Sequence, residues 1–365
     1  MTDTTATTVT NGKTSGPVKL SGVSISMLVL AAIYLPVLFP YLRGLWGKEH
    51  YQFFPFAFAT TCWFSLSVAT PRPDFSAGWF TQTLRITACL AGIILTASGA
   101  VLRSPLVCYA GFSLQFCVLL ELYQDRDTKR RLLFTSLPML LTVRLPMDYD
   151  NRAITGLQLI TSRLSSEFLQ IMNFDHLRRG NVIEPMQGTA LEIADACSGV
   201  QSLFTVMFIA AFIGVSKQYS VLRTLVLMST GVFWALAMNV LRVLTIAVAQ
   251  MGYSIDLSTG WKHDAVGYIA LGLSIPFLLS SDMLLKFLLG GIPDDPKMYP
   301  RKNVLVGFWN WGLTAPSTPA VLSGDASAVL DWQSLRWGHK SAVIALLALV
   351  ICSVLPCWVL PGFLR

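Results

Sequence analysis

The sequence predicts an all-α protein that crosses a membrane several times. Of its 365 residues, 53% are hydrophobic and 13% are charged, whereas about 25% are charged in a typical soluble domain. Apolar runs of the length that spans a bilayer recur along the chain. They lie at about 25–42, 53–70, 84–102, 105–123 and 132–146, and then at 199–216, 221–250, 265–289 and 341–360. These runs predict eight transmembrane helices and a ninth near the end.

The apolar runs and the segments between them divide the chain into four parts. Residues 1–20 are rich in Thr and lack an apolar block, which predicts a disordered tail rather than a cleaved signal. Residues 21–290 form the predicted transmembrane domain, whose first run serves as an uncleaved anchor. Residues 291–340, with several Pro and Trp, are expected to form a cytoplasmic loop, and 341–365 hold a C-terminal transmembrane segment.

Lys and Arg gather in every second loop, which predicts how the chain is oriented. Lys129 to Arg131 follow the fourth run, for example, and Lys217 and Arg223 follow the sixth. Because cytoplasmic loops carry an excess of Lys and Arg, we place the N-terminal tail inside and segments 147–197 and 251–264 outside. The net charge of +7 is therefore a topology signal, and no nucleic-acid partner is expected.

The longer outward segment has two recognisable parts. Apolar residues recur at helical spacing along one face of an amphipathic helix, which we expect to lie on the membrane surface. They are Ile154, Leu157, Leu164, Phe168 and Ile171. Residues 182–184 and 189–193 then flank a Pro-Met-Gln-Gly sequence typical of a tight turn. A short hairpin is therefore predicted just before the sixth run.

Cys197 differs from the other six cysteines, which all sit in apolar stretches. It lies in Asp195-Ala196-Cys197-Ser198-Gly199, where a polar segment meets the start of a span. The unpaired amides of a helix N-terminus carry partial positive charge, which favours the reactive thiolate. A lone cysteine at a helix end is nevertheless inert in most proteins. The spacing of the cysteines predicts neither a disulfide framework nor a zinc site, and no cofactor or metal is expected.

Arg242 interrupts the seventh apolar run about two turns before its outward end. An arginine inside the bilayer costs about 3 kcal/mol on insertion scales and usually faces a protein interior or a water-filled cavity. The alternative is that the long side chain lifts its charge to the headgroups. Asn239, three residues earlier, shares the same face of the helix.

His263 lies at the outward start of the eighth run and can exchange protons near neutral pH. Alone, it is more often a surface residue. The predicted topology, however, brings Cys197, Arg242 and His263 to one leaflet, and consecutive antiparallel helices are usually neighbours. A thiol nucleophile, an imidazole and a guanidinium that holds negative charge can perform acyl transfer. Supporting positions are Ser198, Gly199, Asn239 and Asp264.

The sequence resembles the exosortase/archaeosortase family of membrane cysteine enzymes. The resemblance rests on Ala196-Cys197-Ser198-Gly199, on Asn239-Val240-Leu241-Arg242-Val243, and on His263 followed by Gly267, and it runs from about 132 to 290. It implies that Cys197, Arg242 and His263 are catalytic. Gln201 departs from the basic residue that many members have after Cys-Ser-Gly.

The resemblance also implies a substrate class and a location. The expected substrates are exported proteins with a C-terminal sorting tail: a short motif such as PEP, a transmembrane helix and a basic cluster. Cleavage would leave a thioester on Cys197, which an acceptor nucleophile then resolves. The expected location is the inner membrane of a bacterium that makes an exopolysaccharide or outer envelope, with the active site facing outward.

Two other functions remain open from the sequence. In a transporter, Arg242 would bind an anionic solute and Cys197 would be incidental. This function predicts broken helices or paired half-repeats, and no convincing pair is evident. In a noncatalytic scaffold for exopolysaccharide or envelope assembly, Arg242 would instead pair with an acidic residue such as Asp195 or Asp264. The sequence offers no HExxH, GxSxG or P-loop motif for other membrane chemistries.

Overall fold

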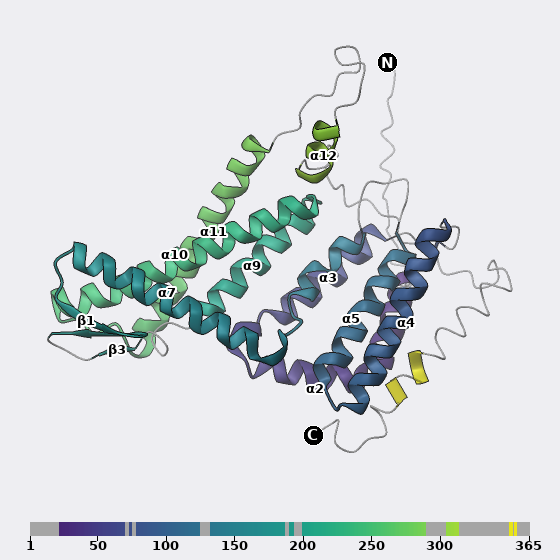
Figure 1. Cartoon of the computed structure of the whole chain (residues 1–365), viewed down its shortest axis with the longest axis horizontal. Coiled ribbons are helices and arrows are strands. Elements are labelled where there is room, and N and C mark those ends of the chain that lie inside the picture. Colours follow the sequence, from purple (N-terminus) through teal and green to yellow (C-terminus); the bar gives the residue numbers. More distant parts are fainter. Residues whose placement is uncertain are drawn as a thin grey trace, which may run out of the picture.

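The computed structural model describes residues 22–69, 73–74, 78–124, 132–186, 190–192, 199–289, 304–313, 350–352 and 354–355. Within these ranges the chain is almost entirely helical, with one small sheet at the end of the molecule where α7 lies (Figure 1). This architecture agrees with the predicted all-α membrane class. The predicted tail 1–20 and most of the predicted C-terminal segment 341–365 lie outside the described residues.

Four described helices are long and apolar enough to cross a membrane. They are α4 (Trp79–Val101), α5 (Pro105–Leu122), α10 (Val221–Tyr253) and α11 (Gly260–Leu288). A fifth span results if the bent pair α1 (Gly22–Ile33) and α2 (Leu35–Trp46) is one crossing. The helix α3 (Phe54–Val68) has 15 residues, and the apolar part of α9 (Gly199–Ser216) is Gln201–Ser216. The polytopic class therefore holds, but the described residues do not confirm eight or nine spans.

The first apolar run is broken rather than forming one straight anchor. Its two helices, α1 and α2, meet at an angle of 79° around Tyr34. Pro36 stands in the first turn of α2 and Pro40 inside it. Proline lacks the amide hydrogen that a continuous helix needs, so the break has a local cause. The Tyr34 hydroxyl is buried and shares a hydrogen bond of 2.8 Å with Thr96 of α4, which fixes the corner.

The fifth apolar run does not form the predicted transmembrane helix over 132–146. It folds instead into three short pieces, η2 (Leu132–Ser136), α6 (Leu137–Leu140) and η3 (Pro146–Asp148). Pro138 and Pro146 prevent a continuous helix. The hydroxyls of Thr135 and Thr142 are buried and donate to nearby main-chain carbonyls. Irregular backbone is tolerated at membrane depth where protein surrounds it and satisfies its polar groups.

The predicted hairpin belongs to a three-stranded antiparallel sheet. Its strands are β1 (His176–Arg179), β2 (Val182–Pro185) and β3 (Leu191–Glu192), in that order. Val182 pairs with Glu192 and Ile183 with Leu191, which are the two predicted strands. The strand β1 was not predicted from the sequence, and it joins β2 through a turn at Gly180, where φ is +62°. Residues 187 and 188 of the predicted turn, and residues 189 and 193 of the predicted second strand, lie outside the described residues.

The amphipathic helix α7 (Tyr149–Ile171) begins five residues before the predicted start of its apolar face at Ile154. Its buried side carries hydroxyls, among them Thr161, Ser162 and Ser165, and packs against α10 and the sheet. Phe168 and Ile171 on the apolar side are exposed. The helix thus contacts protein through small polar residues and through Leu169, which is buried in an apolar cluster with Ile183 and Val243. That its exposed apolar residues lie on the membrane surface stays a prediction.

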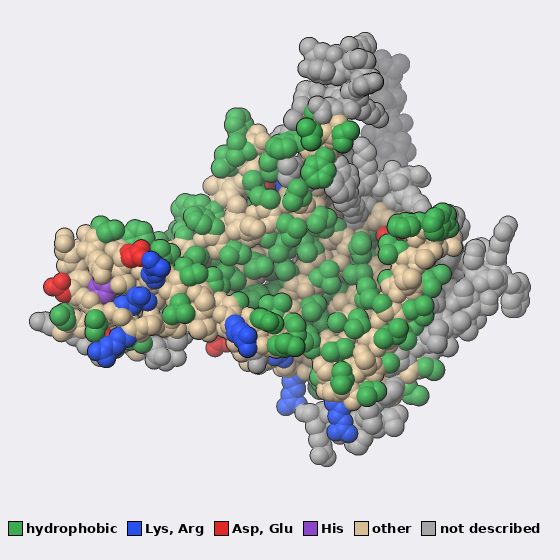
Figure 2. All heavy atoms as spheres, in the orientation of Figure 1, with side chains coloured by type: hydrophobic (Ala, Val, Ile, Leu, Met, Phe, Trp, Pro, Cys, Tyr) green, Lys and Arg blue, Asp and Glu red, His purple; other side chains and the backbone are tan. Residues whose placement is uncertain are grey.

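The helices form two groups that α7 and the short elements join (Figure 1). One group contains α2, α4 and α5, and the other contains α9, α10 and α11, while α3 contacts α9 and the short elements η2 and α6. Figure 2 shows hydrophobic side chains over α3, α4 and α5, whereas charged side chains gather around α7 and the strands. The helix α12 (Val304–Leu313) contacts α10 and falls within the segment predicted to be a cytoplasmic loop.

Asp282 gathers three cations where α9 ends and α10 begins. Its buried carboxylate accepts hydrogen bonds from Lys217 Nζ at 2.6 Å and from the Tyr219 hydroxyl at 3.0 Å. Arg223 Nη2 lies 3.5 Å away and Lys286 Nζ 3.7 Å. The Arg223 guanidinium also stacks 4.0 Å from the centre of the Tyr219 ring. One carboxylate therefore ties together three chain segments at the end of the bundle predicted to face the cytoplasm.

A second buried carboxylate, Asp150, ties α7 to the connection between α2 and α3. Lys48 Nζ lies 3.0 Å from it and His50 Nε2 3.7 Å. Burial, the largest single influence, would raise the pKa of Asp150, but the hydrogen bonds from Lys48 and from the Asn151 amide, together with the charge of Lys48, outweigh it and lower this pKa. Burial and then the Lys48 charge lower the pKa of His50. The His50 ring also contacts Phe204 of α9.

We expect the fold to lose stability as the pH falls from about 7.5 to 5.5, in part through His50. An unfolded histidine takes up a proton near pH 6.5, whereas folded His50 binds it at lower pH, so acidification favours the unfolded chain in this window. The Asp150 contribution is lost only at lower pH, below the usual carboxylate pKa. Thermal unfolding in detergent should show a smaller loss for His50→Gln than for the wild type. Equal losses would contradict the role of His50.

Candidate active site

Arg242 and His263 meet between α10 and α11. Arg242 lies on α10 about three turns before the helix ends at Tyr253, and His263 lies in the first turn of α11. Arg242 Nη2 is 2.6 Å from His263 Nε2 and 3.5 Å from the His263 carbonyl oxygen. Two of the three residues singled out in the sequence are thus brought into direct contact.

The Arg242 side chain is directed into the protein. Its exposed fraction is 9%, and Nε has no hydrogen-bond partner among the described residues. A snorkelling arginine would instead reach the headgroups with an exposed guanidinium. The position of the charge therefore favours a buried function over a passive location in the bilayer.

Gly267 makes room for this arrangement. A Cβ atom at Gly267 would lie 3.0 Å from both Cζ and Nη2 of Arg242. The guanidinium therefore passes directly over the backbone of α11 and reaches His263 one turn earlier. The sequence motif included Gly267, but only the structure shows the reason for a glycine: a side chain there would crowd the Arg242 guanidinium.

The contact also defines a protonation state for His263. A guanidinium offers only donors, so His263 Nε2 must accept the hydrogen bond and cannot carry a proton in this arrangement. The neutral ring then has its proton on Nδ1. His263 Nδ1 is buried without a partner among the described residues. A neutral imidazole with a free N–H is suited to give or pass on a proton.

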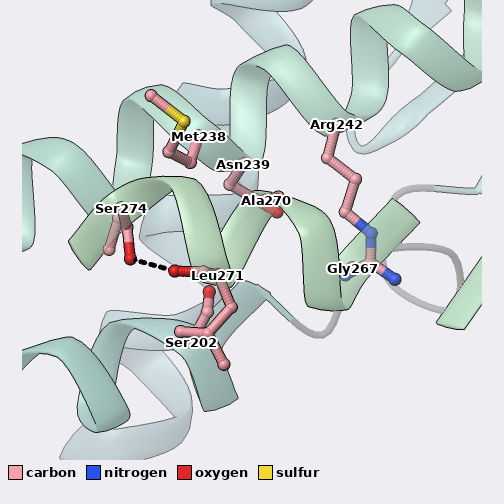
Figure 3. A pocket seen from close by; sticks show the side chains of 9 residues that line it. Ser202, Met238, Asn239, Arg242, Gly267, Ala270, Leu271 and Ser274 are labelled. Carbon is pink, nitrogen blue, oxygen red and sulfur yellow. Dashed lines mark hydrogen bonds between the residues drawn. The ribbon is translucent and has the colours of Figure 1, made fainter. Parts of the chain in front are cut away.

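A small cavity lies beside the two residues, between α9, α10 and α11. Its polar lining includes Ser202 of α9 and Asn239 and Arg242 of α10, and its opposite wall is formed by α11 (Figure 3). The wall residues are Gly267, Ala270, Leu271 and Ser274. The space open to the centre of a water molecule is about 10 Å³, enough for roughly one water molecule or one oxygen atom of a ligand.

The remaining predicted site residues fall into two groups. Cys197 and Ser198 lie outside the described residues, so their convergence with the arginine–histidine pair stays a prediction. Gly199 is the first residue of α9, the helix that carries the cavity residue Ser202. Asp264 is exposed, and among the described residues it forms no ion pair with Arg242. The scaffold alternative based on an Arg242–Asp264 pair is therefore not supported.

Substituting Gly267 with Ala should lower activity by about tenfold, because the Arg242 guanidinium must move by a few tenths of an ångström and a shift of about 1 Å in a catalytic group can cost about 100-fold. The added methyl group would push the Arg242 guanidinium away from His263. The matched control is Gly272→Ala on the same helix, where a Cβ meets no atom within 4 Å. Both variants should be present in the membrane at wild-type levels. Equal activity of the two variants would contradict the role of Gly267.

Comparisons with known proteins bear on what the site does. A family model described as transmembrane exosortase matches residues 23–280, which extend from α1 to the last turns of α11 and include Arg242 and His263. No match was found in searches of curated proteins and of solved structures.

Proposed function

Because the chain belongs to the transmembrane exosortase family, we propose that it is a membrane cysteine peptidase and transpeptidase acting on exported proteins. Its substrates would carry a C-terminal sorting signal of the PEP type: a short motif, a transmembrane helix and a basic cluster. The observation that carries the proposal is the 2.6 Å contact of buried Arg242 with His263. This contact lies beside α9, which begins two residues after Cys197.

The proposed reaction begins when the Cys197 sulfur attacks the scissile carbonyl carbon. The carbonyl oxygen gains negative charge and offers the guanidinium a stronger acceptor than a neutral imidazole nitrogen does. Arg242 turns toward this oxygen and in the same step releases His263 Nε2, which takes the thiol proton as the C–S bond forms. The imidazolium passes the proton on Nδ1 to the leaving amine as the C–N bond breaks.

The product of this step is a thioester between Cys197 and the exported protein, and the sorting tail leaves as a free amine. An acceptor nucleophile then attacks the thioester carbonyl and restores the thiol. Water, a lipid or a glycan could be the acceptor, and water would make the reaction a simple hydrolysis. The proposed site faces the outer surface of a bacterial inner membrane, where exported substrates emerge.

The proposal is tested by co-expressing the chain with reporters that end in candidate sorting tails. Wild-type protein should shorten a reporter by the mass of its tail. Cys197→Ala and His263→Ala should leave the reporter intact while the enzyme accumulates normally in the membrane. Trapping the thioester on Cys197 by mass spectrometry would identify the acylated residue. Full processing by Cys197→Ala would remove the thiol from the mechanism.

The orientation of the site can be tested by labelling single introduced cysteines in cells. Arg178, which is exposed on β1, serves as the position for the outward side. Val221, beside Ser220, is exposed at the opposite end of α10. An impermeant maleimide should label Arg178→Cys in intact cells, and Val221→Cys only after the membrane is opened. The reverse pattern would invert the proposed topology.

A further inference from the structure

Asn239 and Arg242 line the same cavity from neighbouring turns of α10. Residues three apart lie side by side on a helix, and Figure 3 shows both side chains extending from α10 toward α11. The facing wall includes Gly267 and Ala270, whose small size leaves the two polar groups uncovered. The cavity therefore presents an amide and a guanidinium next to each other.

The hydroxyl of Thr161 sets the direction of the Asn239 amide. Asn239 Nδ2 donates to Thr161 Oγ1 of α7 at 3.3 Å. The acceptor Oδ1 is left buried without a hydrogen-bond partner among the described residues. Arg242 Nε, on a side chain nine-tenths buried, likewise has none there. Asn239 Oδ1 and Arg242 Nε are thus an acceptor and a donor that both lack a hydrogen-bond partner among the described residues, although buried polar groups are normally paired.

The group that matches this pair must donate one hydrogen bond and accept another. In an extended peptide, the N–H and C=O of the same residue point to the same side, as they do when strands pair. Such a residue could donate to Asn239 Oδ1 and accept from the Arg242 guanidinium. The cavity has room for about one oxygen atom, which a carbonyl oxygen would occupy.

We propose that Asn239 and Arg242 together bind the backbone of the substrate residue that contributes the attacked carbonyl. Asn239 Oδ1 accepts the N–H of that residue, and Arg242 donates to its C=O as negative charge develops there. This rests on the proposed function and assigns Asn239 a binding contact with the substrate. Because the contact involves only backbone atoms, it holds the tail extended without reading its side chains.

The test is a double-mutant cycle between Asn239 and one atom of the substrate. The probe is a sorting tail that the wild-type enzyme cleaves. In a second version of this peptide, an ester oxygen replaces the backbone N–H of the residue that contributes the attacked carbonyl. The ester lacks the donor, so kcat/KM should fall about fivefold in the wild type and little in Asn239→Ala. An ester one residue further upstream is the control and should affect both enzymes equally.

Thr161→Val separates substrate binding from simple support of the helix. This variant removes the link to α7 but keeps the Asn239 acceptor, so the ester should still lower its kcat/KM. The proposal is overturned if the ester has the same effect in wild type and Asn239→Ala, or no effect in either. Cleavage that persists in Cys197→Ala would refute the thiol mechanism but leave the backbone contact intact. A wild-type enzyme that cleaves no tail would overturn both proposals.

Discussion

Replacing Arg242 with Lys should reduce processing of a sorting-tail reporter by about 100- to 1,000-fold, the range seen when a donor to a developing oxyanion is removed. Lysine keeps the positive charge but offers a single ammonium group. The native guanidinium lines the cavity, reaches His263 Nε2 with Nη2 and has a further buried donor, Nε, without a partner among the described residues. An ammonium group at the end of a flexible chain does not offer this fixed, planar set of donors to the oxyanion. The rate of reporter cleavage in membranes measures this loss.

The control for Arg242→Lys is Arg163→Lys on α7. Arg163 is exposed and pairs with Glu167 at 3.0 Å along the same helix, a kind of contact worth about 0.3–0.5 kcal/mol. Its substitution should leave processing unchanged. If Arg242→Lys also processed the reporter at the wild-type rate, a plain positive charge would suffice. The oxyanion and backbone contacts assigned to the guanidinium would then be wrong.

The contact between Arg242 and His263 shows what the sequence could predict. Arg242 stands out because it is a charged residue inside an apolar run, and His263 because it lies at the start of the next run. Antiparallel helices that follow one another in the sequence usually pack together. The basic loops predicted one leaflet for both residues. Their spacing in the sequence does not specify the 2.6 Å contact, nor that the Arg242 guanidinium lies against the backbone of Gly267. Those features depend on how deeply α10 and α11 pack.

The predicted spans were less accurate, because hydropathy measures composition and not continuity. Residues 132–146 are apolar enough for a helix, yet Pro138 and Pro146 divide them into short pieces. The strand β1 was missed because His176-Leu177-Arg178-Arg179 lacks the apolar and β-branched residues typical of strands. Pairing with β2 gives it an extended form that its own sequence does not favour.

The face of α7 illustrates a third limit. Periodicity located the helix and its apolar residues, including Phe168 and Ile171. The side of the helix that faces the protein carries Thr161 and Ser165 together with Leu169, whereas Phe168 and Ile171 are exposed. Small hydroxyl residues allow helices to approach closely. Apolar periodicity does not identify such a polar contact face, and this explains why the contact from Thr161 to Asn239 was not predicted.

Replacing Asp282 with Asn should destabilise the protein by about 3–5 kcal/mol, the effect of breaking a buried ion pair from one side. Lys217 and Lys286 are exposed enough for water to solvate them, with side-chain exposures of 39% and 50%. Arg223, at 4%, would keep a buried charge with no carboxylate paired to it among the described residues. Unfolding in mixed detergent micelles containing SDS measures the change in free energy.

Two further variants separate the loss of the ion pair from a general loss of packing. Lys286→Gln removes a half-exposed partner and should change stability by only about 0–1 kcal/mol. Adding Arg223→Met to Asp282→Asn removes the stranded charge while keeping an apolar side chain. Because replacing both members of a buried pair is often nearly neutral, the double variant should be more stable than Asp282→Asn alone. If it is less stable, the defect lies in packing around Asp282 rather than in the buried charge of Arg223.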